Sequence, residues 1–321
     1  MTGTVQNIED SLRSVREDIH AALAGIDPEI FDFKNFPFSF MGKAARARFT
    51  ILTGDALALD RRTSCRLAAV AELTHTASLL HDDCLDLARY RRGMPTLNEK
   101  LGINTAILVG DLIVSFAFDF ANGVSPDLVQ ELVLAIRRMT EGALLEENAK
   151  GRKISEAEAG RIAELKTGAL FRWCALAAAR MAGRPQLLET CARIGREAGA
   201  AFQVIDDVID FEGDSGAAGK ETLKDIKEGK FTLPLILAMN DSGAGPEAGK
   251  LLSAMKTGPA ADLAPALELA ALVKAGGFCA AARKSASGKI RDLSPLIDTL
   301  PAPEGAAALK DFLLTLGERT A

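Results

Sequence analysis

Two clusters of aspartates are the residues of this sequence best suited to carry chemistry. Both have the spacing Asp-Asp-x-x-Asp, so their carboxylates stand at i, i+1 and i+4. On a helix, which turns about 100° per residue, such a set lies within about a quarter-turn. Apolar helical sequence precedes both clusters, where three like charges cost several kcal/mol unless a cation or water satisfies them. The candidates are Asp82, Asp83 and Asp86 in the first cluster and Asp206, Asp207 and Asp210 in the second.

Carboxylate oxygens without a cage of cysteine or histidine suit a hard cation, chiefly Mg²⁺. Because Mg²⁺ usually completes its shell with water and substrate phosphate oxygens, the expected substrate is a diphosphate or triphosphate held between two facing helices. A solvated acidic helix end would explain one such cluster equally well. Two clusters with identical spacing make coincidence a poor explanation and favour a metal site.

A diphosphate site also needs side chains that stay positively charged and donate to phosphate oxygens. Each basic residue taken alone is most simply interpreted as a solvated surface charge. Several of them, however, lie near the aspartate clusters in sequence or share a helix face, which favours a common site. His75 stands two helical turns before Asp82 on the same face, where an ordinary hydrogen-bonded core histidine is the plain alternative. The cations in question are Lys43, Arg46, Arg91, Arg92, Lys166, Lys220 and Lys230.

A di-iron carboxylate bundle is a competing interpretation, because Glu72 and His75 have the Glu-x-x-His spacing of such sites. That architecture needs a second motif of the same kind and two further glutamates. The second Glu-x-x-His is absent, so the magnesium interpretation is preferred.

Composition limits the partners and the compartment. The 321 residues include 38 Lys and Arg against 43 Asp and Glu, a net charge of −5 that argues against nucleic acid as the main partner. Five cysteines are scattered singly, as expected of reduced thiols in a cytoplasmic protein. Residues 1–24 form a charged amphipathic stretch rather than a signal peptide, and we expect no apolar run long enough to cross a bilayer.

Helical periodicity dominates the chain, and we expect no strand. Ser155 and Glu158 have capping-box spacing at one helix start, and residues 212–230, rich in glycine and lysine, predict a surface loop or lid. Few aromatic and many alanine and leucine residues also favour helix. We therefore expect one all-α domain over residues 1–321. Its helices are expected near 6–24, 43–59, 62–88, 104–122, 126–149, 155–183 and 186–211, with shorter ones after Pro234.

These motifs together resemble the trans-isoprenyl diphosphate synthases, or polyprenyl synthetases, over roughly residues 40–240. The first cluster with its preceding Glu-Leu-Thr-His and following Arg-Arg-Gly-Met-Pro matches that family's first aspartate-rich region in register. Gly110-Asp111 and Lys166-Thr167-Gly168 resemble its next two landmarks. The segment 199–210 resembles the second aspartate-rich region, and Gly219-Lys220, Asp225 and Gly229-Lys230 resemble the loop after it.

The resemblance implies a helical bundle around a deep central cavity, a homodimer, and roles for individual residues. The six aspartates would bind Mg²⁺ against an allylic diphosphate, with Asp82, Asp83, Asp86, Asp206, Asp207, Lys166 and Lys220 directly catalytic. Arg91, Lys166, Lys220 and Lys230 would bind the allylic diphosphate. Lys43, Arg46, His75 and Arg92 would bind isopentenyl diphosphate, and Thr167 and Gln203 would border the reacting carbons.

Two stretches of the chain depart from the family pattern. The usual Gly-Gly-Lys-Arg-x-Arg-Pro is here Met41-Gly-Lys-Ala-Ala-Arg-Ala47, so Lys43 and Arg46 keep register while one cation and a proline are missing. Glu146 stands where the family more often has glutamine.

The reaction implied by the resemblance is all-trans prenyl transfer from an allylic diphosphate to isopentenyl diphosphate. Class I terpene cyclases share the fold but typically lack a second Asp-Asp-x-x-Asp. Non-catalytic subunits of heteromeric synthases usually lose one or both motifs, whereas this chain keeps both.

Product length depends on what lies beside the growing chain. Positions four and five residues before Asp82 lie about 6–7.5 Å, or one helical turn, below it. They are Ser78 and Ala77, both small, so we expect a medium- to long-chain polyprenyl diphosphate as product. A geranylgeranyl or farnesyl diphosphate synthase is the alternative.

Overall fold

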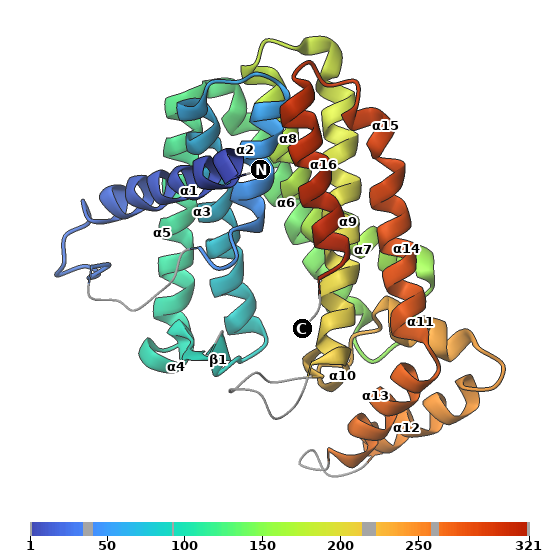
Figure 1. Ribbon diagram of the computed structural model, residues 1–321. Coiled ribbons are helices and arrows are strands. Elements are labelled where there is room, and N and C mark those ends of the chain that lie inside the picture. Colours follow the sequence, from blue (N-terminus) through green and yellow to red (C-terminus); the bar gives the residue numbers. More distant parts are fainter. Residues whose placement is uncertain (1, 35–40, 92, 214–222, 258–262, 320–321) are drawn as a thin grey trace. The chain divides into compact units, whose positions relative to one another are not determined.

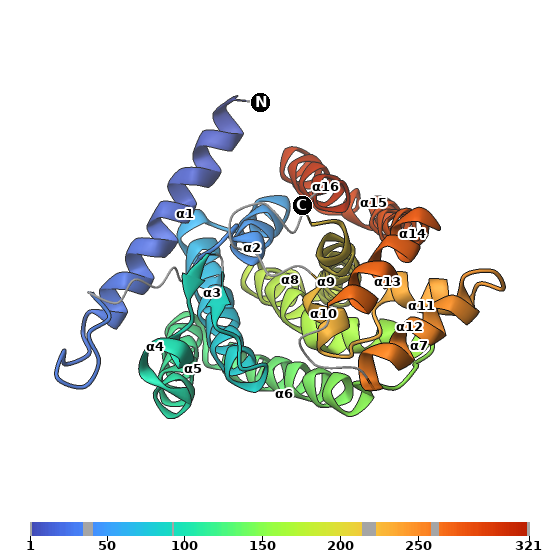
Figure 2. The ribbon, with the colours of Figure 1, turned by 90° about the horizontal axis from the view of Figure 1, so that it is seen from below.

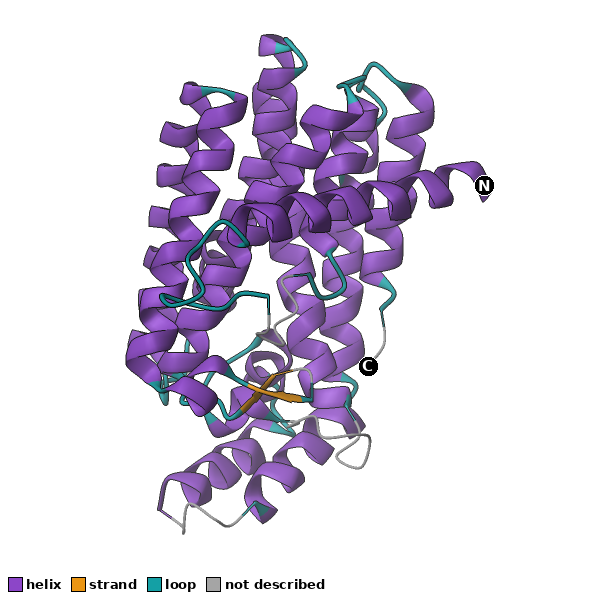
Figure 3. Ribbon diagram, turned by 90° about the vertical axis from the view of Figure 1, so that its left-hand side faces the viewer, coloured by secondary structure: helices purple, strands orange, loops and turns teal. Residues whose placement is uncertain are grey.

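The protein is built almost entirely of helices, as the computed structural model shows (Figure 3). The structure describes residues 2–34, 41–91, 93–213, 223–257 and 263–319. The predicted all-α class is confirmed. Within the described residues, the exception is a two-stranded hairpin of two residues a strand, β1 (Tyr90–Arg91) and β2 (Met94–Pro95), so the expectation of no strand is wrong at this one place.

The chain divides into two compact units. The first unit comprises residues 1–137, 169–195 and 295–312, and the second comprises residues 138–168, 196–294 and 313–321. Each aspartate cluster belongs to a different unit, the first cluster to the first unit and the second to the second. The expectation of one domain over 1–321 stays a prediction.

The first unit is organised around α3 (Arg61–Leu85), which packs against several other helices of the unit (Figure 1). Asp60 begins α3 by accepting a hydrogen bond from the Thr63 amide at 2.9 Å. A run of buried small residues before the aspartates lets the neighbouring helices approach closely. Its neighbours include α1 (Thr2–Leu23), α2 (Ala45–Ala56), α5 (Ile103–Val124) and α8 (Ala169–Met181).

The hairpin directly follows the first aspartate cluster. Gly93, with φ at +75°, takes the left-handed conformation that the tight turn between the strands requires. Buried Thr96 then donates to the Ala88 carbonyl at 2.6 Å and caps α4 (Leu97–Leu101), which lies beside α5 (Figure 2). This packing fixes the strand that carries Arg91.

Helix α5 carries an apolar surface that the described residues leave largely uncovered. It has 22 residues, and its most apolar 18-residue window has a mean hydropathy of 1.6 with 28% of that window buried. By length and composition α5 could cross a membrane, so the expectation that no run is long enough is wrong for this helix. Ile103, Ile107 and Leu108 are 41%, 40% and 67% exposed.

The second unit contains the other helices that matter for the site. Val208 and Phe211, on the same helix as the second aspartate cluster, pack into a core with Leu269, Val273 and Ala282. The unit's elements are α7 (Glu156–Ala163), the π-helical turn η1 (Glu164–Gly168), α10 (Lys224–Lys227), α11 (Leu233–Asn240), α12 (Gly245–Thr257), α13 (Ala264–Ala275) and α14 (Phe278–Asp292). Helices α6 (Pro126–Ala149) and α9 (Leu188–Glu212) contribute residues to both units, while η2 (Pro185–Leu187), α15 (Ser294–Ile297) and α16 (Pro303–Gly317) complete the chain.

Residues 155–183, expected as one helix, run as α7, η1 and α8 without a break. The predicted capping box is present, because the Ser155 hydroxyl accepts from the Glu158 amide and the Glu158 carboxylate accepts from the Ser155 amide. The π-helical turn between α7 and α8 is new relative to the prediction. It carries Lys166 and Thr167, and such turns occur frequently at functional sites.

Candidate active site

The three aspartates of the first cluster are not equivalent. Asp83 is 2% exposed, and Arg91 clamps its carboxylate: Nε lies 2.9 Å from each oxygen and Nη2 lies 2.6 Å from Oδ1. Burial lowers the pKa of Arg91, but the hydrogen bond and charge of Asp83, with Asp82 and Asp86, raise it overall. Arg91 is therefore a fixed cation beside the cluster, held by Asp83.

Asp82 and Asp86 are more exposed than Asp83 and lie where α3 ends. Asp86 caps the helix, its amide donating to the Asp82 carbonyl at 2.9 Å. The charges of both carboxylates add to the rise in the pKa of Arg91, after the larger effect of Asp83. The first unit thus presents two partly exposed carboxylates beside an arginine.

Glu72 fixes the start of α2. It is 2% exposed, and its carboxylate accepts from the Ala47 amide at 2.9 Å in the first turn of that helix. The Arg46 guanidinium lies 5.5 Å from the centre of the Phe171 ring, a cation–π contact that holds it in place. Glu72 therefore positions the segment that carries Lys43 and Arg46, and His75 lies partly exposed one turn further along α3.

The landmark Gly110-Asp111 makes room for His81. A Cβ at Gly110 would lie 2.4 Å from His81 Nε2, closer than van der Waals contact allows. His81 Nε2 lies 3.2 Å from the Ile107 carbonyl and 3.4 Å from Asp111 Oδ1. This contact attaches the residue before the first cluster to α5.

In the second unit, a chain of side-chain hydrogen bonds joins η1 to the second cluster. Thr167, 4% exposed, donates its hydroxyl to Gln203 Oε1 at 2.6 Å. Gln203 then donates from Nε2 to Asp207 Oδ1 at 2.9 Å. The expectation that both side chains border the reacting carbons stays a prediction, and the structure brings the two into contact.

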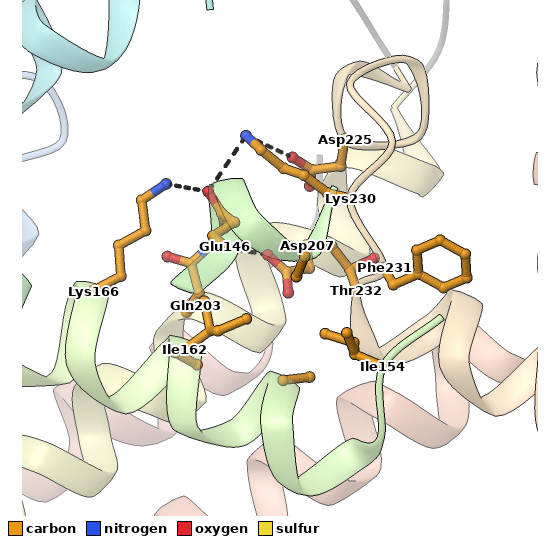
Figure 4. Close-up of a pocket in the computed structure, with 13 residues that line it drawn as sticks. Glu146, Ile154, Ile162, Lys166, Gln203, Asp207, Asp225, Lys230, Phe231 and Thr232 are labelled. Carbon is orange, nitrogen blue, oxygen red and sulfur yellow. Dashed lines mark hydrogen bonds and ion pairs between the residues drawn. The ribbon is translucent and has the colours of Figure 1, made fainter. Parts of the chain in front are cut away.

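Glu146, the departure from the family pattern, lies between the two described lysines of the site. Its Oε2 is 2.6 Å from Lys166 Nζ and 3.7 Å from Lys230 Nζ, and both lysines point toward it (Figure 4). Lys230 also pairs with Glu228 at 2.6 Å and lies 3.8 Å from Asp225. Glu146 thus holds the two cations together.

The carboxylates of the second unit are crowded. Asp210 accepts the amides of Lys224 and Asp225, both at 3.1 Å, and so holds the start of α10. Burial raises the pKa of Asp207 well above its usual range, and the charge of Asp225 adds to the effect. Burial and the charge of Asp210 raise the pKa of Asp225 to about 7. Burial also raises the pKa of Asp210, against the two backbone hydrogen bonds.

These groups line a pocket of about 90 Å³ within the second unit. The lysines and carboxylates occupy one end, and Ile154 and Ile162 line the other (Figure 4). A pocket with convergent polar groups at one end and apolar walls at the other suits a ligand with an anionic head.

The donor set fits a hard divalent cation. The second unit gathers carboxylates whose pKa values are raised by burial, with the charges of neighbouring carboxylates adding to the effect, and a metal ion would offset this negative charge. Within the part of the chain that the structure describes, no three ligand side chains converge closely enough to hold an ion alone. Mg²⁺ does not require this, since it binds through one or two carboxylates with water and substrate oxygens.

Other predicted residues are placed as follows. Ala77 is 1% exposed, whereas Ser78 is partly exposed and donates its hydroxyl to the His75 carbonyl at 2.8 Å. Arg92 and Lys220 lie outside the described residues.

Sequence reasoning missed two features of the second unit. It quoted Asp225 without a role, although Asp225 is part of the crowded carboxylates. It missed Arg319 entirely, and no local motif marks that residue. Arg319 Nη1 lies 3.2 Å from Asp206 Oδ1.

Comparison with known proteins decides the family. The sequence profile of the family described as polyprenyl synthetase matches residues 33–269. The chain belongs to this family. The expected resemblance is therefore confirmed, and with it the class of enzyme, a prenyltransferase.

Relatives in this family match most of the chain. The nonaprenyl diphosphate synthase of Mycobacterium tuberculosis is 30% identical over 288 residues, covering 87% of this chain and 84% of that protein. The octaprenyl diphosphate synthase of Haemophilus influenzae is 34% identical over 75% of this chain and 74% of that protein. A polyprenyl synthase from Caulobacter crescentus, solved in complex with calcium and isoprenyl diphosphate, has a TM-score of 0.87 at 26% identity, covering 99% and 97% of the two chains.

Proposed function

We propose that this polyprenyl synthetase condenses isopentenyl diphosphate with an allylic diphosphate to make an all-trans polyprenyl diphosphate of medium to long chain. The observation that carries the proposal is the set of crowded carboxylates beside Lys166 and Lys230 in the second unit. Both lysines are paired with carboxylates, and a divalent cation would add positive charge to this acidic pocket while the lysines turn to the diphosphate. Relatives named nonaprenyl and octaprenyl diphosphate synthases support the chain length.

Mg²⁺ is the proposed cation, bound by Asp82 and Asp86 of the first cluster and by aspartates of the second. A bound divalent cation supplies electrostatic stabilisation of the negative charge that develops on a departing diphosphate. The solved relative that contains calcium with isoprenyl diphosphate supports a divalent cation of this kind. Both clusters are proposed to serve the same reaction.

Other residues of this chain have separate roles in binding the diphosphate and in enclosing the reacting carbons. Arg91, Lys166 and Lys230 donate to phosphate oxygens while the allylic carbon–oxygen bond breaks and its electron pair leaves with the diphosphate. The double bond of isopentenyl diphosphate attacks the allylic cation, and the released diphosphate accepts the proton lost from the adjacent carbon. Thr167 and Gln203 border the reacting carbons, and the apolar walls exclude the water that would capture the cation.

Isopentenyl diphosphate is proposed to bind at the segment that leads into α2. Lys43 and Arg46 supply the charge, and the Glu72 contact and the Phe171 ring hold that segment in place. Glu72 positions that segment through its contact with the Ala47 amide, and this contact accounts for a buried glutamate at this place.

Incubating the pure protein with Mg²⁺, farnesyl diphosphate and labelled isopentenyl diphosphate tests the function. Elongated allylic diphosphates, longer than geranylgeranyl diphosphate, are the expected products. Hydrocarbon products would indicate a terpene cyclase, and the absence of turnover would indicate a non-catalytic subunit. A product that stops at farnesyl or geranylgeranyl diphosphate would indicate a short-chain synthase.

A homodimer is proposed as the working form. The apolar surface of α5, with Leu108 67% exposed, is the surface that a second copy would cover. We propose a cytoplasmic enzyme that does not span the membrane, and the described cysteines, all free and buried, suit a reducing compartment. Sedimentation of the purified protein without detergent, with Leu108→Glu as the variant, tests the dimer.

A further inference from the structure

A residue from the end of the described chain lies against the second aspartate cluster. Helix α16 ends at Gly317, and two residues later Arg319 Nη1 lies 3.2 Å from Asp206 Oδ1. Asp206 is the first aspartate of the cluster and its side chain is 39% exposed. An arginine 113 residues away in sequence thus pairs with a carboxylate that the proposed function assigns to a metal ion.

The Arg319 side chain is held from several sides. Its guanidinium lies 5.1 Å from the centre of the Phe202 ring, one turn before Asp206 on α9. Its carbonyl accepts a hydrogen bond from Arg283 Nη1, and Arg283 Nη2 pairs with Glu212 on the same helix α9 at 2.5 Å. Only 21% of the side chain is exposed, so Arg319 is a positioned cation and not a solvated surface charge.

A guanidinium and a divalent cation repel each other, and here both would use the same carboxylate. A metal ion that binds Asp206 Oδ1 must therefore displace the Arg319 guanidinium or lie close to it. A guanidinium also matches the oxygens of a diphosphate, to which it can donate two parallel hydrogen bonds.

We propose that Arg319 pairs with Asp206 before the metal binds, yields this carboxylate to the metal ion, and then donates to the diphosphate that binds with the metal. The proposal rests on the proposed metal role of Asp206. It makes the metal and the diphosphate depend on each other. The metal alone pays the cost of displacing Arg319, whereas a diphosphate gives the released guanidinium a new partner.

Thermodynamic linkage turns this exchange into a measurable signature. If Arg319 competes with the metal, removing it strengthens metal binding to the free protein. If Arg319 also serves the diphosphate, removing it reduces the extent to which diphosphate strengthens metal binding. A purely structural role for Arg319 predicts neither effect, because local damage at Asp206 would weaken metal binding.

Titration of the full chain with Mn²⁺, followed by the electron paramagnetic resonance signal of the free ion, measures both quantities. Wild type, Arg319→Gln and Arg319→Lys are titrated with and without inorganic diphosphate. Arg291→Gln is the matched control, since it removes one exposed positive charge from α14 in the same unit. Arg319→Gln is expected to bind Mn²⁺ roughly fivefold more tightly without diphosphate and to gain less from adding it. The Mn²⁺ affinity of Arg319→Lys should lie between those of Arg319→Gln and wild type, and the affinity of Arg291→Gln should equal that of wild type.

An unchanged or weaker Mn²⁺ affinity in Arg319→Gln overturns the proposal, as does an equal gain in Arg291→Gln. Asp206→Asn separates this failure from that of the proposed function. If Asp206→Asn loses Mn²⁺ affinity while Arg319→Gln equals wild type, the Arg319 exchange alone is wrong. If Asp206→Asn binds Mn²⁺ as wild type does, the metal role of Asp206 fails, and the Arg319 proposal with it.

Discussion

The three carboxylates of the first cluster have different surroundings, and we infer that they have different roles. Asp83 is enclosed and accepts every hydrogen bond that the structure shows from Arg91, whereas Asp82 and Asp86 are more exposed. A buried ion pair costs several kcal/mol when one partner is removed, because the other charge then stays uncompensated. The main role of Asp83 is therefore to position Arg91, and any contact of Asp83 with a metal ion would be an additional role.

Replacing Asp83 by Asn tests this division. The variant leaves Arg91 without a charged partner, so we expect the KM for the allylic diphosphate to rise about tenfold or more while the Mn²⁺ affinity of the free protein changes little. The double variant with Arg91→Gln should be no worse than Arg91→Gln alone, because the two side chains act as a pair. Additive losses in the double variant, or a large loss of Mn²⁺ affinity in Asp83→Asn, would argue for a direct metal role. Circular dichroism checks that each variant is folded.

The raised pKa of Asp225, about 7, predicts how the stability of the metal-free protein depends on pH. A carboxyl whose pKa is raised by folding contributes stability that is present below its unfolded value near 3.8 and is lost as the pH rises to about 7. Between pH 5 and pH 8 in chelator, wild type should therefore lose about 2–3 kcal/mol more than Asp225→Asn, which lowers Tm by several degrees. Asp292→Asn, an exposed carboxylate on α14, is the control. Thermal melts that run parallel for wild type and Asp225→Asn would show that this carboxyl does not titrate in the range.

At the scale of elements, the position of the π-helical turn depends on a close contact with α6. A Cβ at Gly142 would lie 2.5 Å from the Lys166 backbone nitrogen and 2.9 Å from the Leu165 carbonyl carbon. Neither is a flexible side-chain end, so the backbone itself would have to move. Gly142 therefore sets where Lys166 and Thr167 stand.

Gly142→Ala should cost at least 1–3 kcal/mol of stability through overpacking, or else displace η1 and lower kcat by about tenfold or more. Gly160→Ala on α7 is the matched control, since no atom lies within 4 Å of its added Cβ and alanine favours the helix by about 0.5–1 kcal/mol. Denaturant unfolding and steady-state kinetics measure both variants. If Gly142→Ala is as stable and as active as Gly160→Ala, the contact does not position η1.

Most helices could be predicted from the sequence, because a buried face repeats with the helical period whatever it packs against. The capping box at Ser155 was predicted for the same reason, since its signal is local. The π-helical turn could not be predicted from the sequence. Its position depends on the close contact between Gly142 and the backbone of Lys166, and these residues are far apart in sequence. The two-residue strands were missed because such short pairs have no alternating pattern.

The sequence indicates candidate site residues only where a motif is local. Both clusters, Thr167 and Gln203 follow from such motifs, and their roles in binding and catalysis stay predictions. The clamp between Asp83 and Arg91 needs the hairpin to fold back, and the contact between Arg319 and Asp206 joins residues 113 apart with no motif around Arg319. No spacing in the sequence could have indicated either.

For the whole molecule, product length tests the predicted path of the growing chain past α3. Ala77 is enclosed and Ser78 is partly exposed, so a phenylalanine fits more readily at Ser78, while Ala77→Phe would overpack the core by about 1–3 kcal/mol. We expect Ser78→Phe to shorten the products by several isoprene units at similar stability. Ser253→Phe on α12, an exposed serine of the second unit, controls for added bulk. Radio-chromatography of the dephosphorylated products gives the lengths, and an unchanged distribution in both Ala77→Phe and Ser78→Phe would mean that the chain grows elsewhere.

The central claim is that both aspartate clusters, one in each unit, serve one metal-dependent elongation reaction. The most direct measurement is the turnover of labelled isopentenyl diphosphate at buffered free Mg²⁺ for wild type, Asp82→Ala and Asp206→Ala. We predict no turnover in chelator, recovery on adding Mg²⁺, and a loss of orders of magnitude in each variant at saturating substrate. Near-normal turnover by either variant, or by wild type in chelator, would contradict the claim.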